Sequence, residues 1–330
     1  MTQHRYAVLG AGALGGFYGA KLKAAGHEVH FLLRSDWEHV RHHGLFVETP
    51  EGAIHLPQVA AYGDVLEMPP CDRVLVTLKT TSNHYLPSLL PHVLKEDGVV
   101  VTLQNGLGIE AEIADIVGRD RVMGGLCFIC SNKVGPGHVR HLDYGSITLG
   151  EYAADGQPQP ISERQQQIGQ DFQQAGIETH LVNDLMLARW RKLVWNIPFN
   201  GLSVVLDAST EELMADPHSR ELAAALMRET VESATVCLTA NPDTSGKASR
   251  IISPEFVEEM LAATEQMKPY RTSMKIDFDE HRNMEVEAIF GNALRAAQQA
   301  GHHPKRIEAL YQQLKFLDTR NQRICVELAL

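Results

Sequence analysis

The first half of the chain alternates short apolar, β-branched runs with segments of helical periodicity. The runs predict strands at Arg5–Leu9, Glu28–Leu32, Arg73–Thr77, Val99–Leu103, Val122–Ile129, His138–His141 and Ser146–Leu149. The intervening pattern predicts helices at Gly12–Ala25 and Ser82–Val93, and one that Ser162 caps and Gly176 ends. Alternating strands and helices are typical of βαβ units, so we expect a doubly wound, mostly parallel sheet in residues 1–182.

The strand pattern stops beyond about Val182, and residues 183–330 have the pattern of an all-α domain. The start and stop signals are Asp216-Pro217 as cap and first turn, Asn283 as a cap, Gly301 as a stop and Pro304 as a further start. The strongest loop signal in this half is the segment 241–246. We therefore expect two domains, the first α/β and the second helical.

Composition narrows the class of protein. A chain of 330 residues with 44% apolar and 22% charged residues is typical of two globular domains. A net charge of −11 without a Lys/Arg-dense segment argues against a nucleic-acid or anionic-membrane partner. With no apolar stretch long enough for a membrane span and no signal-peptide layout, we expect a cytoplasmic location.

The five cysteines do not indicate a disulfide framework, since their number is odd and no export signal precedes them. Cys127 and Cys130 form a C-x-x-C, but they lie in an apolar run that predicts a strand, whereas redox pairs usually open a helix. Two thiols do not complete a zinc site, and no other residue set indicates a metal.

A glycine motif directly follows the first predicted strand. It consists of Gly10, Ala11, Gly12, Ala13, Leu14 and Gly15, and it opens a predicted helix. In this context G-x-G-x-x-G is the fingerprint of a Rossmann-type dinucleotide site, where the glycines serve the turn, the approach of the pyrophosphate and helix–strand packing. We expect these six residues to bind the cofactor's phosphates.

The second predicted strand decides between the two nicotinamide cofactors. NAD sites usually place an acid at its end, where the acid accepts hydrogen bonds from the ribose 2′-OH. Here Arg34 stands in that stretch, and its guanidinium suits the 2′-phosphate of NADPH, although Asp36 keeps NAD open. Lys79 and Asn105, each at the end of a later strand, are further candidates for cofactor contacts, with a purely structural role as the alternative.

A polar stripe crosses an otherwise apolar predicted helix in RKLVWNIPFN. Lys192, Asn196 and Asn200 recur every four residues and therefore share one helix face. The alternative is a solvent-facing stripe on an amphipathic helix, but the apolar residues on the other sides indicate a largely buried helix. Pro198 should kink it.

Taken together, these segments resemble the ketopantoate reductase (2-dehydropantoate 2-reductase) family along nearly the whole chain. The matching stretches are GAGALG, LVTLK ending at Lys79, QNG with Asn105, RKLVWNIPFN, and TSMKIDFDEHRNMEVEAIFG with Ser273 and Glu285. The resemblance implies NADPH-dependent reduction of ketopantoate to pantoate, a step towards pantothenate, with a small 2-oxo acid as substrate. A homodimer is compatible with the helical half.

The resemblance also implies roles for individual residues. Lys192 would be the general acid, and Asn196 and Asn200 would bind substrate. Ser273 would contact the substrate carboxylate, and Glu285 would act near the lysine, the substrate hydroxyl and the cofactor. The further implied contacts are Asn105 on cofactor and substrate and Arg34 on the 2′-phosphate. A lysine can serve as acid where burial lowers its pKa towards the working pH.

The chain departs from the family pattern at two places, Tyr270 in place of a polar substrate-binding residue and Phe290 before Gly291, where asparagine is common. These departures leave the substrate open. Alternatives are a reductase of another 2-oxo or 3-oxo acid and a dinucleotide-binding sensor without turnover.

Overall fold

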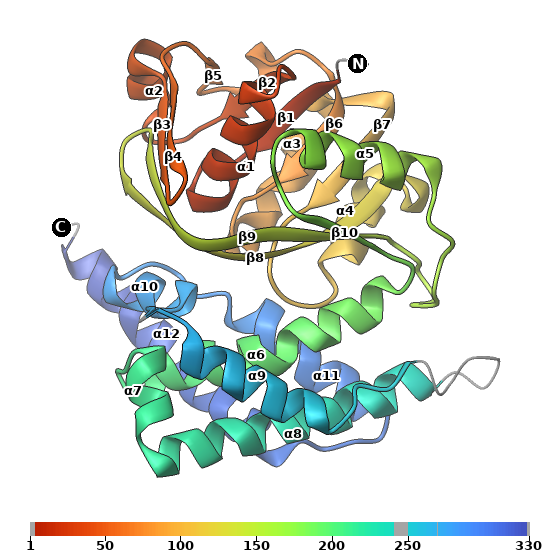
Figure 1. Ribbon diagram of the computed structural model, residues 1–330, viewed down its shortest axis with the longest axis vertical. Coiled ribbons are helices and arrows are strands. Elements are labelled where there is room, and N and C mark those ends of the chain that lie inside the picture. Colours follow the sequence, from red (N-terminus) through yellow and green to blue (C-terminus); the bar gives the residue numbers. More distant parts are fainter. Residues whose placement is uncertain (1–3, 241–249, 269, 329–330) are drawn as a thin grey trace. The chain divides into compact units, whose positions relative to one another are not determined.

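The computed structural model describes residues 4–240, 250–268 and 270–328 and forms two compact units (Figure 1). Unit 1 comprises Met1–Gln104 and Ile109–Leu185, and unit 2 comprises Asn105–Gly108 and Met186–Leu330. The short loop Asn105–Gly108 thus groups with the C-terminal residues, although it lies within the N-terminal half of the sequence. The predicted loop at 241–246 lies outside the described residues.

Unit 1 is built on one ten-stranded sheet. Its strands are β1 Arg5–Leu9, β2 Glu28–Leu32, β3 Leu45–Thr49, β4 Gly52–Leu56, β5 Ala60–Tyr62, β6 Cys71–Val76, β7 Leu94–Thr102, β8 Val122–Gly135, β9 His138–Glu151 and β10 Thr179–Val182. The order is β4-β3-β9-β8-β7-β6-β1-β2-β5, and β10 pairs with β9. The series from β5 to β8 is parallel, which confirms the predicted doubly wound core.

The sheet's two faces carry separate cores, which explains the alternation of side chains along β1. Tyr6 and Val8 pack with residues of α1 (Ala13–Ala24) and α5 (Glu163–Gln174), while Ala7 and Leu9 pack with α3 (Leu86–Val93) and α4 (Ile109–Val117). Successive strand residues point to opposite faces, so helices on both sides require apolar residues at every position. This is why the strand is predicted so readily.

Several strand predictions are confirmed and others need correction. β1 and β2 begin and end where predicted, and β9 is one strand instead of two, with an irregularity at Tyr144 and Gly145, both at positive φ. The predicted helix Ser82–Val93 begins as a 3₁₀ turn, Thr80–Tyr85, before α3. The strands β3, β4, β5 and β10 were not predicted, because they are short and only partly buried.

Unit 2 is helical. Its elements are α6 Leu185–Val205, α7 Thr210–Ala215, α8 Pro217–Thr239, α9 Glu255–Gln266, α10 Ser273–Asp279, a π-helical turn Glu287–Gly291, α11 Asn292–Gln299 and α12 Lys305–Leu328. Its core contains Trp190 and Phe199 of α6, both almost fully buried, and also Leu107 from the Asn105–Gly108 loop. The all-α prediction is confirmed for the described part of this half.

Most of the predicted helix starts and ends are confirmed. Asp216 caps α8 by accepting the N–H groups of His218 and Ser219, both at 2.9 Å, and Ser162 caps α5. The predicted cap at Asn283 is wrong, since helical backbone begins at Val286. Tertiary bonds hold this stretch in place: the Asp318 carboxylate accepts the Met284 N–H at 3.0 Å, so the chain there satisfies its backbone without forming a helix.

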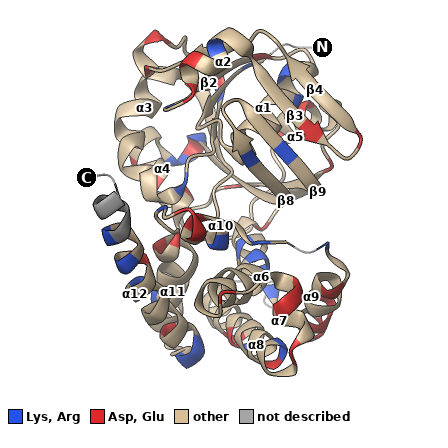
Figure 2. Cartoon of the chain, turned by 90° about the vertical axis from the view of Figure 1, so that its left-hand side faces the viewer, with Lys and Arg blue, Asp and Glu red and all other residues tan. Residues whose placement is uncertain are grey.

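The charge distribution and the apolar character of the helices concern which partners the protein can bind. Lys and Arg residues are interspersed with Asp and Glu residues in both units (Figure 2). Among the described residues, no helix combines the length and the apolar character that crossing a membrane requires.

Candidate active site

The glycine motif joins β1 to α1 at the carboxyl ends of the parallel strands. Gly10 has φ +99°, and a Cβ there would lie 2.8 Å from the Leu78 side chain, so only glycine fits this turn without strain. The N–H of Gly12 donates to the Gly10 carbonyl at 2.8 Å, which closes the turn. β1 is flanked by β2 on one side and β6 on the other, so the motif lies at the switch point where doubly wound sheets bind ligands.

Gly15 permits the close packing of α1 on the sheet. A Cβ at this position would overlap the carbonyl oxygen of Gly10 and lie 2.5 Å from Oγ1 of Thr77. That hydroxyl donates to the carbonyls of Leu9, at 3.0 Å, and Gly10, at 2.7 Å, so the contact surface is rigid. The third glycine of the motif therefore serves helix–strand packing.

The N-terminus of α1 suits a phosphate. Its cap is Gly12, which has no side chain to satisfy the first N–H groups, and its first turn has no acid. A Cβ placed on Gly12 would meet no protein atom within 4 Å, so the surface in front of this backbone is open. Unpaired N–H groups and the positive end of the helix dipole attract an anion, which fits a dinucleotide pyrophosphate.

Arg34 and Asp36, between β2 and α2 (Trp37–His43), are in different environments. The Arg34 side chain is exposed, as a residue that reads a phosphate must be. Asp36 is only 8% exposed; its Oδ2 accepts the Gly137 N–H at 3.1 Å and lies 2.9 Å from Nζ of Lys133. The acid that kept NAD open in the sequence is therefore already paired within the protein.

Lys79 stands at the N-cap position of the 3₁₀ turn that follows β6, without a side-chain capping bond, and is half-buried. The turn is held by Gln104, whose Nε2 donates to the Leu78 carbonyl at 2.8 Å and to Oδ1 of Asn83 at 2.7 Å. Gln104 is 2% exposed and is not among the residues predicted above. Its place before Asn105 in the QNG segment is the signal that identifies it.

In unit 2, the polar stripe on α6 is directed inwards. Asn196 is 6% exposed and Asn200 is 3% exposed, which rules out a solvent-facing stripe for the asparagines, while Lys192 is half-buried. Nδ2 of Asn196 is buried without a hydrogen-bond partner among the described residues. Because buried amides are normally paired, this donor is a candidate for ligand contact. α6 runs through Pro198 as one helix.

Lys192 meets Asn105 although the two are far apart in the sequence. Nζ of Lys192 donates to Oδ1 of Asn105 at 2.8 Å. The loop that carries Asn105 is anchored in unit 2: the Leu107 N–H donates to the Ala288 carbonyl at 2.9 Å, and Nδ2 of Asn292 donates to the Leu107 carbonyl at 2.6 Å. The loop therefore holds an amide acceptor against the lysine.

Gly106 fixes the close approach of this loop. Its φ is +108°, and a Cβ would lie within 3 Å of the backbone of Ala288, with the carbonyl oxygen in direct overlap. Any side chain at Gly106 would push the loop away from the π-helical turn. The glycine of the QNG segment thus sets the position of Asn105.

Ser273 is the first residue of α10 and is half-buried. It is not the helix cap, since Oγ1 of Thr272 accepts the Lys275 N–H at 3.2 Å and also pairs with Oγ of Ser203 on α6 at 2.8 Å. Asn200 adds a second link, with its Oδ1 accepting the Met274 N–H at 3.4 Å. The two links place Ser273 beside the asparagine stripe.

Glu285 lies just before the π-helical turn and is 4% exposed. Its carbonyl accepts the Ile289 N–H at 3.2 Å, so Glu285 occupies the position directly before the first helical turn. The same turn anchors the Asn105 loop through Ala288. Glu285 and Asn105 are therefore held by one rigid segment of unit 2.

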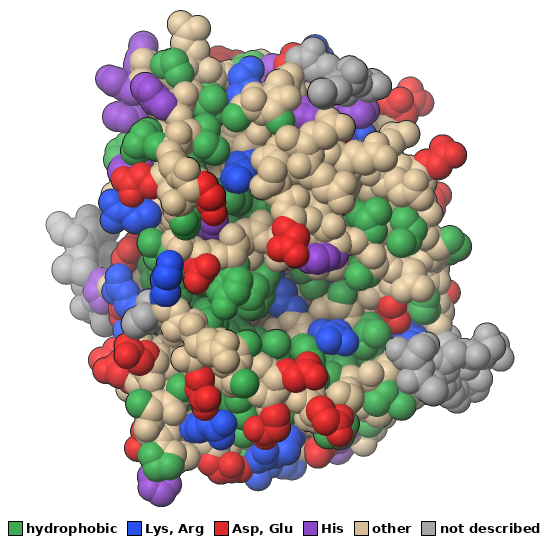
Figure 3. All heavy atoms as spheres, viewed as in Figure 1, with side chains coloured by type: hydrophobic (Ala, Val, Ile, Leu, Met, Phe, Trp, Pro, Cys, Tyr) green, Lys and Arg blue, Asp and Glu red, His purple; other side chains and the backbone are tan. Residues whose placement is uncertain are grey.

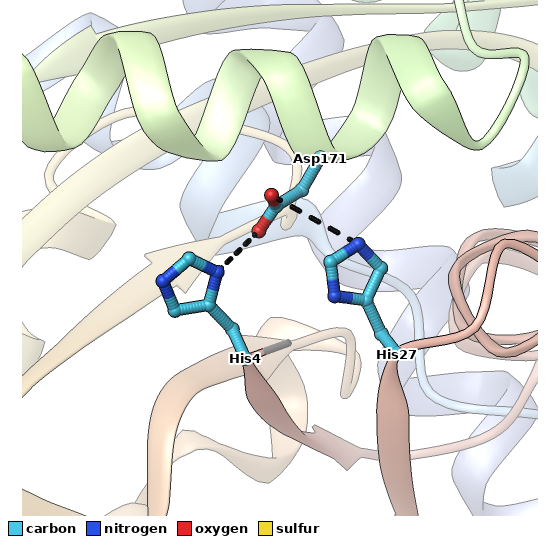
Figure 4. Close-up of side chains that lie close together, drawn as sticks. All are labelled: His4, His27 and Asp171. Carbon is cyan, nitrogen blue, oxygen red and sulfur yellow. Dashed lines mark hydrogen bonds and ion pairs between the residues drawn. The ribbon is translucent and has the colours of Figure 1, made fainter. Parts of the chain in front are cut away.

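A cluster near the amino-terminal ends of β1 and β2 has the residue types of a metal site. His4, His27 and Asp171 offer ligand atoms within 4.8 Å of one another (Figure 4). Arg73, however, forms an ion pair with Asp171 and lies 3.1 Å from Nε2 of His4. A fixed guanidinium in this position opposes a second cation, so we interpret the cluster as a buried charge network.

Histidines also gather on α2, at the upper left of Figure 3. His39 and His43 lie one helical turn apart, with ring centroids 4.5 Å apart, which is a spacing known from metal ligands. This H-x-x-x-H spacing on a helix was not among the patterns predicted from the sequence. Nδ1 of His43 is 3.1 Å from the His39 carbonyl, and this pair is not part of any three-ligand group among the described residues.

The chain is similar to known proteins along most of its length. The family profile "Ketopantoate reductase PanE/ApbA" matches residues 6–154, and its C-terminal counterpart matches residues 184–318. The chain is 56% identical to a 2-dehydropantoate 2-reductase of Nostoc sp. over 98% of both chains. It is similar to the solved 2-dehydropantoate 2-reductases of Geobacter metallireducens (TM-score 0.87, 39% identity, 94% of this chain and 99% of that one) and Methylococcus capsulatus (TM-score 0.82, 31% identity, 96% and 97%).

Proposed function

Because the chain belongs to the ketopantoate reductase family, we propose that it reduces ketopantoate to pantoate with NADPH, a step towards pantothenate and coenzyme A. The observation that carries the proposal is the contact of Lys192 with Asn105 beside the buried amides of Asn196 and Asn200. A proton donor and amide groups on one rigid helix are what the reduction of a polar ketone requires.

Residues 1–182 form the cofactor-binding domain in this proposal. The phosphates would lie against the backbone of residues 10–15, with Arg34 at the 2′-phosphate and Lys79 at the ribose or a phosphate. The open surface before Gly12 and the uncapped start of α1 fit such a group. When bound, NADPH supplies the hydride that adds to the ketone carbon.

Residues 183–330 form the substrate domain, to which the Asn105 loop contributes. Lys192 donates a proton to the ketone oxygen as negative charge develops there, and the neutral amine regains its proton from solvent. Oδ1 of Asn105 accepts a hydrogen bond from the Lys192 ammonium at 2.8 Å. The ammonium is therefore already positioned, and the reaction does not bear the entropic cost of fixing it. The proton thus reaches the oxygen from a prepositioned group.

The remaining polar groups would bind substrate. Ser273 would donate to the carboxylate, and Asn196 and Asn200 would contact its oxygens. An unpartnered buried amide such as Nδ2 of Asn196 gains a hydrogen bond from such a ligand, which recovers the free energy that its burial costs. Glu285 would steady the lysine and the product hydroxyl, and together with Asn105 it would also border the cofactor.

A turnover comparison tests the proposal. Purified protein should oxidise NADPH with ketopantoate much faster than with smaller 2-oxo acids that lack its branched, hydroxylated side chain. A preference for another oxo acid would redirect the assignment to a related reductase. Absence of NADPH oxidation with every oxo acid, by a protein that still binds NADPH, would instead indicate a sensor.

We also propose a homodimer located in the cytoplasm, with small molecules as its other partners. Phe316 on α12 leaves 65% of its surface exposed, so a charge placed there probes whether this helix face lies between copies. Sedimentation of the protein at increasing concentration measures the state. A Phe316→Glu variant should then shift a dimer towards monomer.

A further inference from the structure

Lys133 is a charged residue beside the proposed cofactor site to which no role has been given. It lies on β8, near the turn into β9, and its side chain is 35% exposed. Its Nζ is 2.9 Å from Oδ2 of Asp36, the same oxygen that accepts the Gly137 N–H. A hairpin from a distant part of the chain, with Gly137 following Asp36 by 101 residues, therefore reaches the end of β2.

Asp36 lies in the stretch after β2 where a dinucleotide site reads the cofactor's ribose. A carboxylate in this stretch of a dinucleotide site accepts hydrogen bonds from a 2′-OH and repels a 2′-phosphate. The Asp36 side chain is 9% exposed and its charge is balanced by Lys133. Without that balance, its negative charge would oppose the positive field that the exposed Arg34 provides.

We propose that Lys133 is a specificity residue for NADPH, acting by neutralising Asp36 and by committing its carboxylate to the hairpin. The inference rests on the proposed function, in which NADPH is the cofactor and its 2′-phosphate lies beside Arg34. It adds that the preference depends on the β8–β9 hairpin as well as on the end of β2. Loss of the Lys133 charge turns Asp36 into a repulsive group.

Lys133→Met tests the charge at nearly constant side-chain length. The ratio of kcat/KM for NADPH to that for NADH should fall roughly tenfold, because the uncompensated charge of Asp36 would then repel the 2′-phosphate. The fall should shrink as salt is raised, because salt screens such repulsion. Asp36→Asn in the Lys133→Met background should restore the preference, and Lys133→Arg should keep it.

Binding of adenosine 2′,5′-bisphosphate and of 5′-AMP, measured by calorimetry, reports the same discrimination without any substrate. Lys133→Met should weaken the bisphosphate and leave 5′-AMP nearly unchanged. Arg140→Ala is the matched control on this hairpin, since it removes the Arg140–Glu48 ion pair and should leave the ratio unaltered.

Equal weakening of both nucleotides by Lys133→Met would mean that the lysine only holds the hairpin, and an unchanged ratio would mean that it does not influence the cofactor; either result overturns the inference. A wild-type protein that binds the bisphosphate no better than 5′-AMP would overturn the NADPH assignment itself, and the inference with it. Failure of ketopantoate turnover with normal discrimination between the nucleotides would remove only the substrate assignment.

Discussion

The two units build their sites from different material. In unit 1 the proposed pyrophosphate site is six consecutive residues, and its essential features are backbone turns and missing side chains, as at Gly12 and Gly15. In unit 2 it is a set of side chains from separate segments, such as Lys192 and Asn105, brought together by tertiary contacts. The first kind of site should fail when atoms are added, and the second when atoms are removed.

The largest effect is expected when the ammonium is removed from unit 2. Lys192→Met should lower kcat by roughly 10²–10⁴, the usual contribution of a positioned acid, while NADPH binds normally. Steady-state kinetics and NADPH titration measure the two quantities. Lys305→Met, on an exposed lysine of α12, is the control that should change neither. A folded, NADPH-binding Lys192→Met enzyme with near-normal kcat would refute the proposed acid.

Adding one carbon tests unit 1. Gly15→Ala should destabilise the fold by about 1–3 kcal/mol or more, because its methyl group overlaps the Gly10 carbonyl. Gly12→Ala is the matched variant, since its methyl group meets no protein atom within 4 Å; it should fold normally and bind NADPH poorly. Thermal unfolding and NADPH titration separate the two. If both variants lost stability alike, the motif would be only a packing device.

Two neighbouring hydroxyls sharpen the comparison within unit 2. Ser273→Ala should raise the KM for ketopantoate by an amount equivalent to about 1.5–3 kcal/mol, the cost of a hydrogen bond to a charged group, without changing stability. Thr272→Ala should instead lower the free energy of unfolding by about 1–2 kcal/mol, since Thr272 caps α10. An unaltered KM in Ser273→Ala would leave that residue without a role in binding.

The cofactor preference gives a smaller effect. Arg34→Ala should raise the KM for NADPH roughly tenfold and leave that for NADH nearly unchanged, because only NADPH has the 2′-phosphate. Arg41 is also exposed and lies on α2, and Arg41→Ala should change the KM of neither cofactor. Equal losses for NADPH and NADH would contradict the assignment of Arg34.

The smallest effect concerns pH. Desolvation lowers the pKa of His27 below its ordinary value of 6.5, although Asp171 opposes the shift. The unfolded chain therefore takes up the proton first, so this contribution to stability is complete above pH 6.5 and is lost as the pH falls through the lower pKa of the folded state. Below this pH, the free energy of unfolding should fall less steeply in His27→Phe than in the wild type. The difference in that fall, measured by denaturant unfolding, should be about 1 kcal/mol or less. An unchanged slope would show that His27 does not titrate in this range.

How much the sequence predicts follows from the same distinction. β1 and β2 are predicted to the residue because burial on both faces makes them continuously apolar, whereas β3 and β4 are half-exposed and lack that pattern. The residues of the glycine motif are consecutive, so the sequence alone predicts the geometry of its turn. The wrong cap at Asn283 has the opposite cause, since a distant carboxylate on Asp318 determines that backbone.

The helical site was predicted in part. Periodicity placed Lys192, Asn196 and Asn200 on one face, but the pairing of Lys192 with Asn105 depends on how a distant loop packs. The same holds for Lys133 and Asp36, which no local pattern connects. Ser273 and Thr272 are adjacent residues that can both cap a helix, and the bond that Thr272 accepts from the Lys275 N–H, together with its contact to Ser203, distinguishes them.

The membership of Asn105–Gly108 in unit 2 limits how this protein can be recombined. A single crossover near residue 182, which would exchange whole cofactor domains between relatives, would also exchange Asn105 and Gly106 while leaving Lys192 and Ala288 behind. Lys192 and its acceptor Asn105 would then come from different parents, as would the loop and the turn that holds it. Functional chimeras should therefore require Asn105–Gly108 to travel with the C-terminal half, so the inherited module is discontinuous in the gene although it is compact in space.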